Sequence, residues 1–265
     1  MKYDKGINKI KHIISCILVI IIIFCLYKII YKQYEYHIAN EQTQKIQHVM
    51  NLNSENIKEP SFFNKLEISK IIINANKLKD INSDYQGWLI VNGTNVNYPV
   101  VQTNNDNYYL HNSFYKEKSI EGNPFIYDKT NVNECLNLSS TDSNNMIIFG
   151  HNMRNGTMFE SISNFKDTKF FDDHKYIEFI RNGKVYVYEI FGDAVVHANY
   201  PYIVSTFNSD DSFYGYIAGI KQQAYFWRDI PVKYGDNILT LSTCSYEFNN
   251  ARFIVLAKLI KVIGE

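Results

Sequence analysis

A cysteine and an arginine occupy facing ends of two apolar segments near the C-terminus. Cys244 ends the segment Asn237–Cys244, Arg252 begins the segment Arg252–Ile260, and the short stretch Ser245–Ala251 lies between them. Nearly continuous apolar runs of this length indicate buried strands. Two strands joined by a short loop would place the thiol and the guanidinium together at one edge of a sheet. Such a pair offers a nucleophile beside a group that can stabilise developing negative charge.

The position of Cys244 favours a reactive thiol over its alternative, a packing residue. A free cysteine in an apolar strand is usually a small buried hydrophobe. Cys244, however, ends its strand, is flanked by serine and threonine, and precedes a polar loop that would leave it accessible. Access to substrate and a nearby positive charge are what a thiolate nucleophile requires. For Arg252 the alternative is a surface ion pair with Glu247, an interaction that contributes little to stability.

His151 is the histidine best placed to act with the thiol. The apolar segment Met146–Gly150 predicts a strand that ends at a glycine, so His151 opens the following loop, Asn152–Gly156. An imidazole at such an edge can exchange protons with reacting groups, although a histidine there can equally be an ordinary surface residue. Further candidates for the histidine and arginine roles are His111, Arg154 and Arg228.

These segments resemble the motifs of sortases, specifically those of class B. Thr240–Cys244 with Arg252 eight residues later resembles the family's active-site strand, and Gly150–Met153 resembles its histidine motif. The resemblance covers about residues 80–262 and extends through Asp84–Leu89, Gly93–Thr94, Tyr98–Gln102, Asn107–Leu110, Ile147–Met153 and Gly156–Phe159.

The resemblance implies an activity, a cysteine transpeptidase, and a role for each residue. Cys244 would attack the carbonyl of a substrate threonine to form a thioacyl enzyme, while His151 protonates the leaving amine. An amine of a peptidoglycan precursor would then attack the thioester, with His151 as base and Arg252 stabilising the oxyanion in both halves. The implied partners are surface proteins with a C-terminal sorting signal and the peptidoglycan amine acceptor. The signal, a pentapeptide, would be bound by the chain segment that runs from the helix predicted over 209–226 to Cys244.

The loop after the cysteine departs from the family pattern. Some class B members have a longer insertion there and an acid directly after the cysteine, whereas here Ser245 follows Cys244. A third, triad-like acid is therefore not assigned. The sequence also lacks the acidic cluster that class A relatives use for calcium, so no metal requirement is predicted.

Short apolar segments from Trp88 onward predict the strands that would position these residues. The dipeptides Asn92-Gly93 and Asn182-Gly183 are turn signals, the second typical of a hairpin. Helices are predicted over Thr157–Phe165 and over Ser209–Phe226, the latter with a serine N-cap. Short strands with few helices favour a small mixed barrel, so the expected fold is mainly β with helices, a sortase-like closed β-barrel over residues 80–265. The predicted strands are Trp88–Val91, Val96–Gln102, Phe125–Tyr127, Met146–Gly150, Tyr176–Arg181 and Val185–Phe191.

An apolar run of nineteen residues, Ile13–Tyr31, predicts a single transmembrane anchor. Lysines precede it, so the positive-inside rule places residues 1–12 in the cytoplasm and the catalytic domain outside the cell membrane. The alternative, a cleaved signal peptide, lacks a small-residue cleavage site after the run. Residues 32–79 show helical spacing of apolar residues with a break near Pro60, which predicts a stalk and N-terminal helices. A loosely ordered linker is the alternative for 33–58.

Composition limits the remaining possibilities. The 265 residues suit one medium domain with attachments, and 27 basic against 27 acidic residues give no sign of a nucleic-acid surface. Of the four cysteines, Cys16 and Cys25 lie in the apolar run, which leaves Cys135, in an apparent polar loop, and Cys244. Neither a disulfide framework nor a zinc-type cluster follows, and no cofactor is predicted.

Three other functions are compatible with the same residues. In a cysteine endopeptidase water would replace the amine, and in a pilin-polymerising sortase the acceptor would be another subunit. A non-catalytic surface module would use the barrel cleft to bind peptides. A papain-like fold is disfavoured, because papain-like proteases place the cysteine before the histidine and at a helix start, whereas here His151 precedes a strand-end Cys244.

Overall fold

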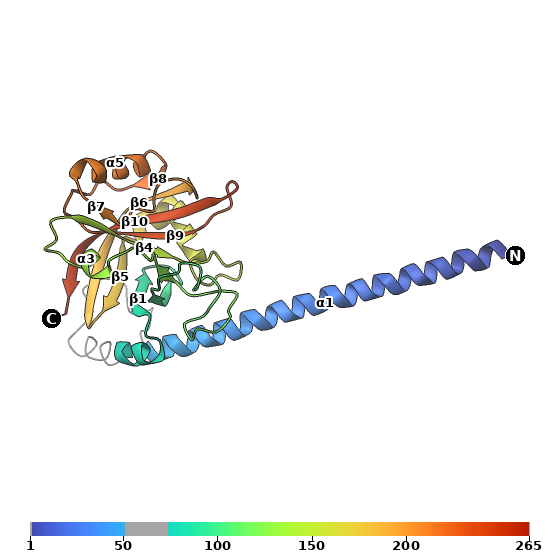
Figure 1. Ribbon diagram of the computed structural model, residues 1–265. Coiled ribbons are helices and arrows are strands. Elements are labelled where there is room, and N and C mark those ends of the chain that lie inside the picture. Colours follow the sequence, from blue (N-terminus) through green and yellow to red (C-terminus); the bar gives the residue numbers. More distant parts are fainter. Residues whose placement is uncertain (1, 51–73, 265) are drawn as a thin grey trace.

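The computed structural model describes residues 2–50 and 74–264, and Figure 1 shows one long helix leading into a β-rich domain. Helix α1 spans Lys2–Met50, and residues 74–81 form a further helical segment. The strands are β1 (Tyr85–Val91), β2 (Asn97–Val101), β3 (Phe125–Ile126), β4 (Ser143–Phe149), β5 (Tyr176–Arg181), β6 (Lys184–His197), β7 (Thr206–Phe207), β8 (Ala224–Trp227), β9 (Ile238–Cys244) and β10 (Ala251–Ile263). The other described helices are α3 (Val132–Cys135), the 3-10 helix η2 (Glu160–Lys166), α4 (Thr168–Asp173) and α5 (Asp210–Lys221).

Eight of the described strands close into a barrel. Hydrogen-bonded neighbours follow the order β10-β9-β4-β3-β2-β1-β5-β6, and β6 pairs with β10 to complete the ring. The short strands β7 and β8 attach to β4 and β6. Closure satisfies the backbone groups that an open sheet would leave at its edges. The predicted fold class, mainly β with helices and a closed barrel, is confirmed.

The hairpin predicted at Asn182-Gly183 joins β5 to β6. Both residues have positive φ, 50° and 73°, which is the backbone geometry of a two-residue turn between strongly twisted strands. Asparagine and glycine are the residues that adopt this geometry at least cost. This local signal was therefore sufficient to predict the connection.

Both predicted helices need correction. The first, predicted over Thr157–Phe165, is the 3-10 helix η2 and begins only at Glu160, because Met158 has a positive φ of 55° and bridges to Asn152. The second begins as predicted, with Ser209 as N-cap, but ends at Lys221. After a turn at Gln222 and Gln223, Ala224–Trp227 form β8, whose backbone pairs with β6 instead of continuing the helix.

Apolar side chains are buried on both faces of the barrel. One cluster fills the interior and includes Leu89, Phe179 and Phe253 from different strands. A second lies outside β1 and β6, where the C-terminal part of α1 and the 74–81 helix cover it, and a third lies under α5. The C-terminal part of α1 and the 74–81 helix therefore cover part of the barrel.

Helix α1 runs without interruption from the apolar segment to the barrel. It is the one described helix long and apolar enough to cross a membrane, and its apolar segment is exposed. Further along, Ile46 and Met50 are buried against the barrel, and Gln47 donates to the Asn97 carbonyl (2.8 Å). Residues 33–50 are therefore helical in the structure and belong to α1. The predicted break near Pro60 lies outside the described residues.

Candidate active site

The strand order brings the predicted site residues to one edge of the barrel. Strand β9 lies between β4, which is parallel to it, and β10, which is antiparallel. Phe149 is paired with Ser242, so His151 and Cys244 each follow that pair by two residues at the same end of the barrel. Cys244 is itself paired with Arg252. Because neighbouring strands are about 4.8 Å apart, the three backbones lie side by side.

Hydrogen bonds tie the His151 loop to the Cys244 strand. Asn152 donates its side-chain amide to the carbonyl of Cys244 (2.8 Å). The Thr243 hydroxyl donates to the carbonyl of Gly150 (2.7 Å), and the Gly150 N–H donates to the carbonyl of Ser242 (3.1 Å). Cys244 is half-buried and unbonded to another cysteine. Cys244 therefore lies at a partly accessible position, and these hydrogen bonds hold its strand beside the His151 loop.

The imidazole of His151 is oriented by a main-chain carbonyl. Its Nε2 lies 2.8 Å from the carbonyl oxygen of Leu110. A carbonyl only accepts hydrogen bonds, so Nε2 carries a proton and Nδ1 is the nitrogen that can gain or lose one. Among the residues that the structure describes, no carboxylate bonds this ring. Leu110 thus takes the orienting position that an acid occupies in many catalytic triads.

The nearby acid, Glu247, is engaged by Lys166 of η2. Lys166 pairs with Glu247, donates to the Ser245 hydroxyl (2.8 Å) and lies 4.7 Å from the centre of the Phe253 ring. Burial acts to raise the pKa of Glu247, but hydrogen bonds from Lys166 and Ser245 and the lysine charge lower it below its ordinary value. Lys166 therefore fastens the loop that follows Cys244.

Arg252 does not form the surface ion pair that the sequence left open. Its Nη1 donates to the carbonyl of Ala251 (3.0 Å), while Glu247 pairs with Lys166. Within the described residues no carboxylate lies within ion-pair distance of Arg252. The guanidinium is half-buried at the same edge as Cys244, where it retains donors for a substrate oxygen.

Tyr202 is a buried neighbour of the site that sequence reasoning missed. Its hydroxyl lies 3.0 Å from the Ser242 hydroxyl. Burial raises the pKa of Tyr202, the Ser242 hydrogen bond and the charge of Arg252 lower it, and the charge of Cys244 raises it again. The phenol is thus within electrostatic reach of both residues. Tyr202 precedes β7 in an irregular segment, so no periodic pattern marked it.

The other sequence candidates occupy different places. Arg228 donates to the carbonyls of Ile190 and His174 and stacks on Phe171, so its donors are already used. His111 lines a groove of about 500 Å³ between α1 and the loop around residues 118–120. Arg154 is exposed in the His151 loop. None of these three lies on the strands that carry Cys244 and Arg252.

Cys135 is not in an exposed polar loop. It ends the short helix α3, is fully buried in the barrel core, and its pKa is raised to about 12 by that burial. A buried thiol with a raised pKa is unreactive near neutral pH. Cys244 is therefore the accessible thiol of the β domain.

Comparisons with known proteins agree with this arrangement. Residues 89–260 match the family model described as the sortase domain. The chain is 31% identical over 256 residues to the sortase B of Staphylococcus aureus, covering 94% of this chain and 96% of that protein. A crystal structure of a mutant sortase B from Clostridium perfringens is 34% identical and covers 83% of this chain and 97% of that one, with a TM-score of 0.71. A Staphylococcus aureus sortase B–substrate complex is 26% identical and covers 86% of this chain and 99% of that one, with a TM-score of 0.70.

Proposed function

Because this chain belongs to the sortase family, and within it to class B, we propose that its cysteine transpeptidase chemistry is carried by Cys244, His151 and Arg252. The observation that supports this assignment is the register of three neighbouring strands. Phe149–Ser242 and Cys244–Arg252 are paired positions, so one barrel edge presents all three side chains. No other described thiol of the β domain is accessible.

The first half-reaction forms a thioester. The Cys244 thiolate attacks the carbonyl carbon of the substrate threonine, and the C–N bond to the next residue then breaks. His151 gives the leaving amine its proton from Nδ1, since Nε2 is bonded to Leu110. Arg252 donates to the carbonyl oxygen as it gains charge, an interaction typically worth about 3 kcal/mol in the transition state.

The second half-reaction transfers the acyl group. An amine of a peptidoglycan precursor attacks the thioester carbon, the C–S bond breaks, and Cys244 returns to thiolate. His151 Nδ1 accepts the proton that the attacking amine loses, which restores the starting state. The same histidine acts in both directions, so its orientation by the Leu110 carbonyl must persist throughout the cycle.

The substrate is a protein with a C-terminal sorting pentapeptide, cleaved after threonine. The related S. aureus sortase B was solved as a complex with a substrate, which supports binding of a peptide by this fold. Here we expect the pentapeptide along the segment between β6 and β9, where Tyr202 lies beside Ser242. Ile203, which follows Tyr202, and Phe248, in the loop after Cys244, are exposed apolar side chains that can contact a peptide.

The membrane arrangement follows from α1. We assign residues 1–12 to a cytoplasmic tail, 13–31 to the anchor, 32–79 to a stalk with packing helices, and 80–265 to the extracellular catalytic domain. The lysines before the apolar run and the exposure of that run in α1 support this assignment.

The test uses the full chain in detergent micelles, with peptides of Asn-Pro-Xaa-Thr and Ser-Pro-Xaa-Thr-Gly type and with or without an amine acceptor. Mass spectrometry should show cleavage after threonine and transfer to the amine, and Cys244→Ala should abolish both. Cys135→Ala is the matched control and should leave the products unchanged. Cleavage to free acid alone in the presence of amine would support the endopeptidase alternative, and an active Cys244→Ala would refute the assignment.

A further inference from the structure

Glu121 is a buried carboxylate that joins its own loop to the loop that follows His151. Its side chain is 1% exposed, and its Oε1 accepts hydrogen bonds from the Asn155 amide (2.7 Å) and the Thr157 hydroxyl (2.9 Å). Both donors belong to the loop that His151 opens. A buried hydrogen bond is costly to break because its groups would be left without partners, so this one oxygen can hold the tip of the loop.

The His151 loop is closed at its base and held at its tip. The Phe159 N–H donates to the His151 carbonyl (2.9 Å), and Asn152 bridges to Met158. Between these contacts, the described long-range side-chain hydrogen bonds of the loop are those of Asn155 and Thr157, and both go to Glu121. Glu121 therefore fixes the part of the loop that its own backbone contacts leave free.

The segment that carries Glu121 also holds Leu110. The Ser119 N–H donates to the His111 carbonyl (3.0 Å), and the Asn123 N–H donates to the Tyr109 carbonyl (2.9 Å). These two bonds hold residues 109–111 beside residues 119–123, so the segment that carries Glu121 runs alongside Leu110, whose carbonyl accepts from His151. Gly122 has a φ of +60°, and a Cβ there would lie 2.3 Å from the Tyr109 carbonyl oxygen, so this close pairing requires glycine.

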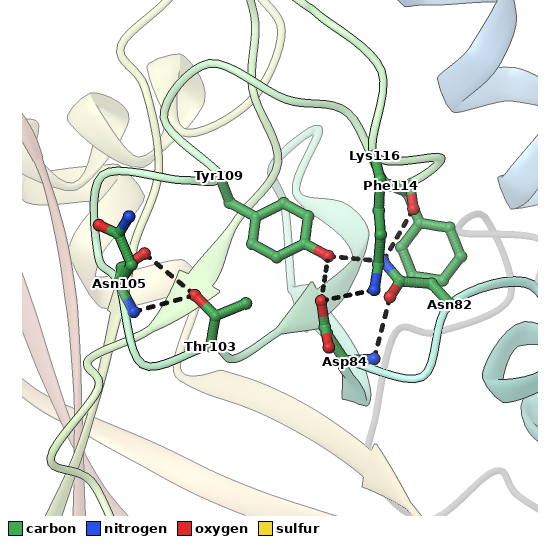
Figure 2. A network of polar contacts seen from close by, with 7 residues as sticks. All are labelled: Asn82, Asp84, Thr103, Asn105, Tyr109, Phe114 and Lys116. Atoms are coloured by element: carbon green, nitrogen blue, oxygen red, sulfur yellow. Dashed lines mark hydrogen bonds and ion pairs between the residues drawn. The ribbon is translucent and has the colours of Figure 1, made fainter.

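A second anchor holds Leu110 from the other side. Figure 2 shows the Tyr109 hydroxyl donating to Asp84 (2.8 Å) and accepting from the Asn82 amide (2.8 Å), while Lys116 pairs with Asp84 (2.9 Å). Tyr109 is buried and directly precedes Leu110. The Leu110 carbonyl is thus presented by a segment that is held by the Tyr109 side chain and by backbone hydrogen bonds to residues 119–123.

These contacts form a closed ring of hydrogen bonds that passes from His151 to Leu110, across to the Glu121 segment, through Glu121 to Asn155 and Thr157, and back along the loop to His151. We propose that Glu121 is a positioning residue for His151, because it closes this ring and so keeps the Leu110 carbonyl on Nε2 and leaves Nδ1 free toward Cys244. This inference rests on the proposed role of His151. Glu121 itself touches neither Cys244 nor Arg252 among the described contacts.

The test compares Glu121→Ala with Glu121→Gln in the full chain, and with Glu117→Ala as the matched control. Glutamine keeps a carbonyl oxygen that can accept both hydrogen bonds, whereas alanine keeps none. Glu117 is an exposed carboxylate of the same loop whose side chain bonds Gln42. We expect Glu121→Ala to lower kcat by about tenfold to a hundredfold with little change in KM, as small misplacement of a catalytic group does. Glu121→Gln should recover most of the loss.

A second readout separates positioning from simple stabilisation. In protein with 15N-labelled histidine, the His151 imidazole should show one dominant Nε2–H form in the wild type and a mixture in Glu121→Ala.

If Glu121→Ala does not fold, the pair Asn155→Ala and Thr157→Val removes the same two hydrogen bonds from the His151 loop and should lower kcat by a similar factor. A lower melting temperature with unchanged kcat and an unchanged His151 signal would overturn the inference. Should His151→Gln keep full activity, the proposed mechanism itself fails; should it be inactive while Glu121→Ala is fully active, only the positioning role fails.

Discussion

Cys244 lies directly opposite Arg252 in the antiparallel pair of β9 and β10. Residues opposite each other in such a pair have side chains on the same face of the sheet, with Cβ atoms about 5 Å apart. A tetrahedral intermediate on the sulfur of Cys244 would therefore form within reach of the guanidinium. This relationship supports the proposed joint role of the two residues and leads to the first prediction.

Arg252→Lys should be nearly as damaging as Arg252→Ala. Lysine keeps the charge but loses the planar set of donors that can reach an oxyanion beside the sulfur. We expect kcat/KM to fall by about 100-fold or more in both variants, as for loss of an oxyanion donor. Steady-state cleavage of a sorting peptide measures this, with Arg154→Lys, in the exposed part of the His151 loop, as control. A fully active Arg252→Lys would show that charge alone is needed.

Lys166→Met should loosen the loop that follows Cys244. Lys166 bonds Ser245 and Glu247 and lies over Phe253, and methionine would keep only the apolar contact. We expect kcat/KM to fall about tenfold, as modest displacement of a nucleophile does. The matched control is Lys169→Met, whose partner Asp173 forms a solvent-exposed i,i+4 pair that contributes little. Equal activity of both variants would show that the loop needs no such contact.

Folding stability should fall as the pH rises from about 4.5 to about 8 because of Glu178. This side chain is fully buried on β5, both carboxylate oxygens are without hydrogen-bond partners in the described structure, and burial raises its pKa from 4.5 to about 8. Between about pH 4.5 and 8 the folded state therefore keeps a proton that the unfolded state releases. The free energy of unfolding is highest below pH 4.5 and falls through this range by up to a few kcal/mol.

Glu178→Gln should remove much of this pH dependence. The amide cannot ionise, so the variant should gain stability relative to wild type at pH 8 and lose that advantage near pH 4.5. Chemical denaturation at several pH values measures the effect, with the half-buried Glu189→Gln on the neighbouring strand as control. Asp193, whose pKa burial raises to about 7, adds a dependence of the same sign in both proteins. Parallel curves for wild type and Glu178→Gln would contradict the prediction.

Ile46→Ala should destabilise the domain by about 2–5 kcal/mol, the usual cost of truncating a buried isoleucine. Ile46 belongs to α1, and its side chain is 1% exposed because it packs against the outside of the barrel. Thermal unfolding of the full chain in micelles measures the loss, and the exposed neighbour Lys45→Ala serves as control. An unchanged melting temperature would mean that α1 only rests against the barrel.

The part of the site that the sequence predicted is the part encoded by local pattern. Two apolar runs with a short loop placed Cys244 beside Arg252, and the structure has them as register partners. The Asn182-Gly183 turn was equally local. In contrast, the parallel pairing of Phe149 with Ser242 joins residues far apart in the chain, and only the family resemblance brought His151 to the same edge before the structure was known.

The residues that sequence reasoning missed act through long-range contacts. Leu110 contributes a backbone carbonyl, which no side-chain pattern can mark. In the sequence Glu121 is indistinguishable from an exposed loop acid, because its burial and its two hydrogen-bond donors depend on the folded structure. The error over β8 has a local and a long-range part, because the aromatic residues of Ala224–Trp227 favour a strand and their pairing with β6 is visible only in the structure. The burial of Cys135 likewise depends on packing against distant strands.

The unbroken course of α1 would determine how the β domain is oriented at a membrane. With the apolar segment spanning the bilayer as proposed, no hinge separates Tyr31 from the residues that pack on the barrel, starting near Ala39. Adding one residue to a helix moves the rest of the chain by about 1.5 Å along the axis but turns it by about 100°. The number of residues in this short segment therefore sets how the barrel edge with Cys244 is rotated about the helix axis. It has much less effect on the height of that edge above the lipid.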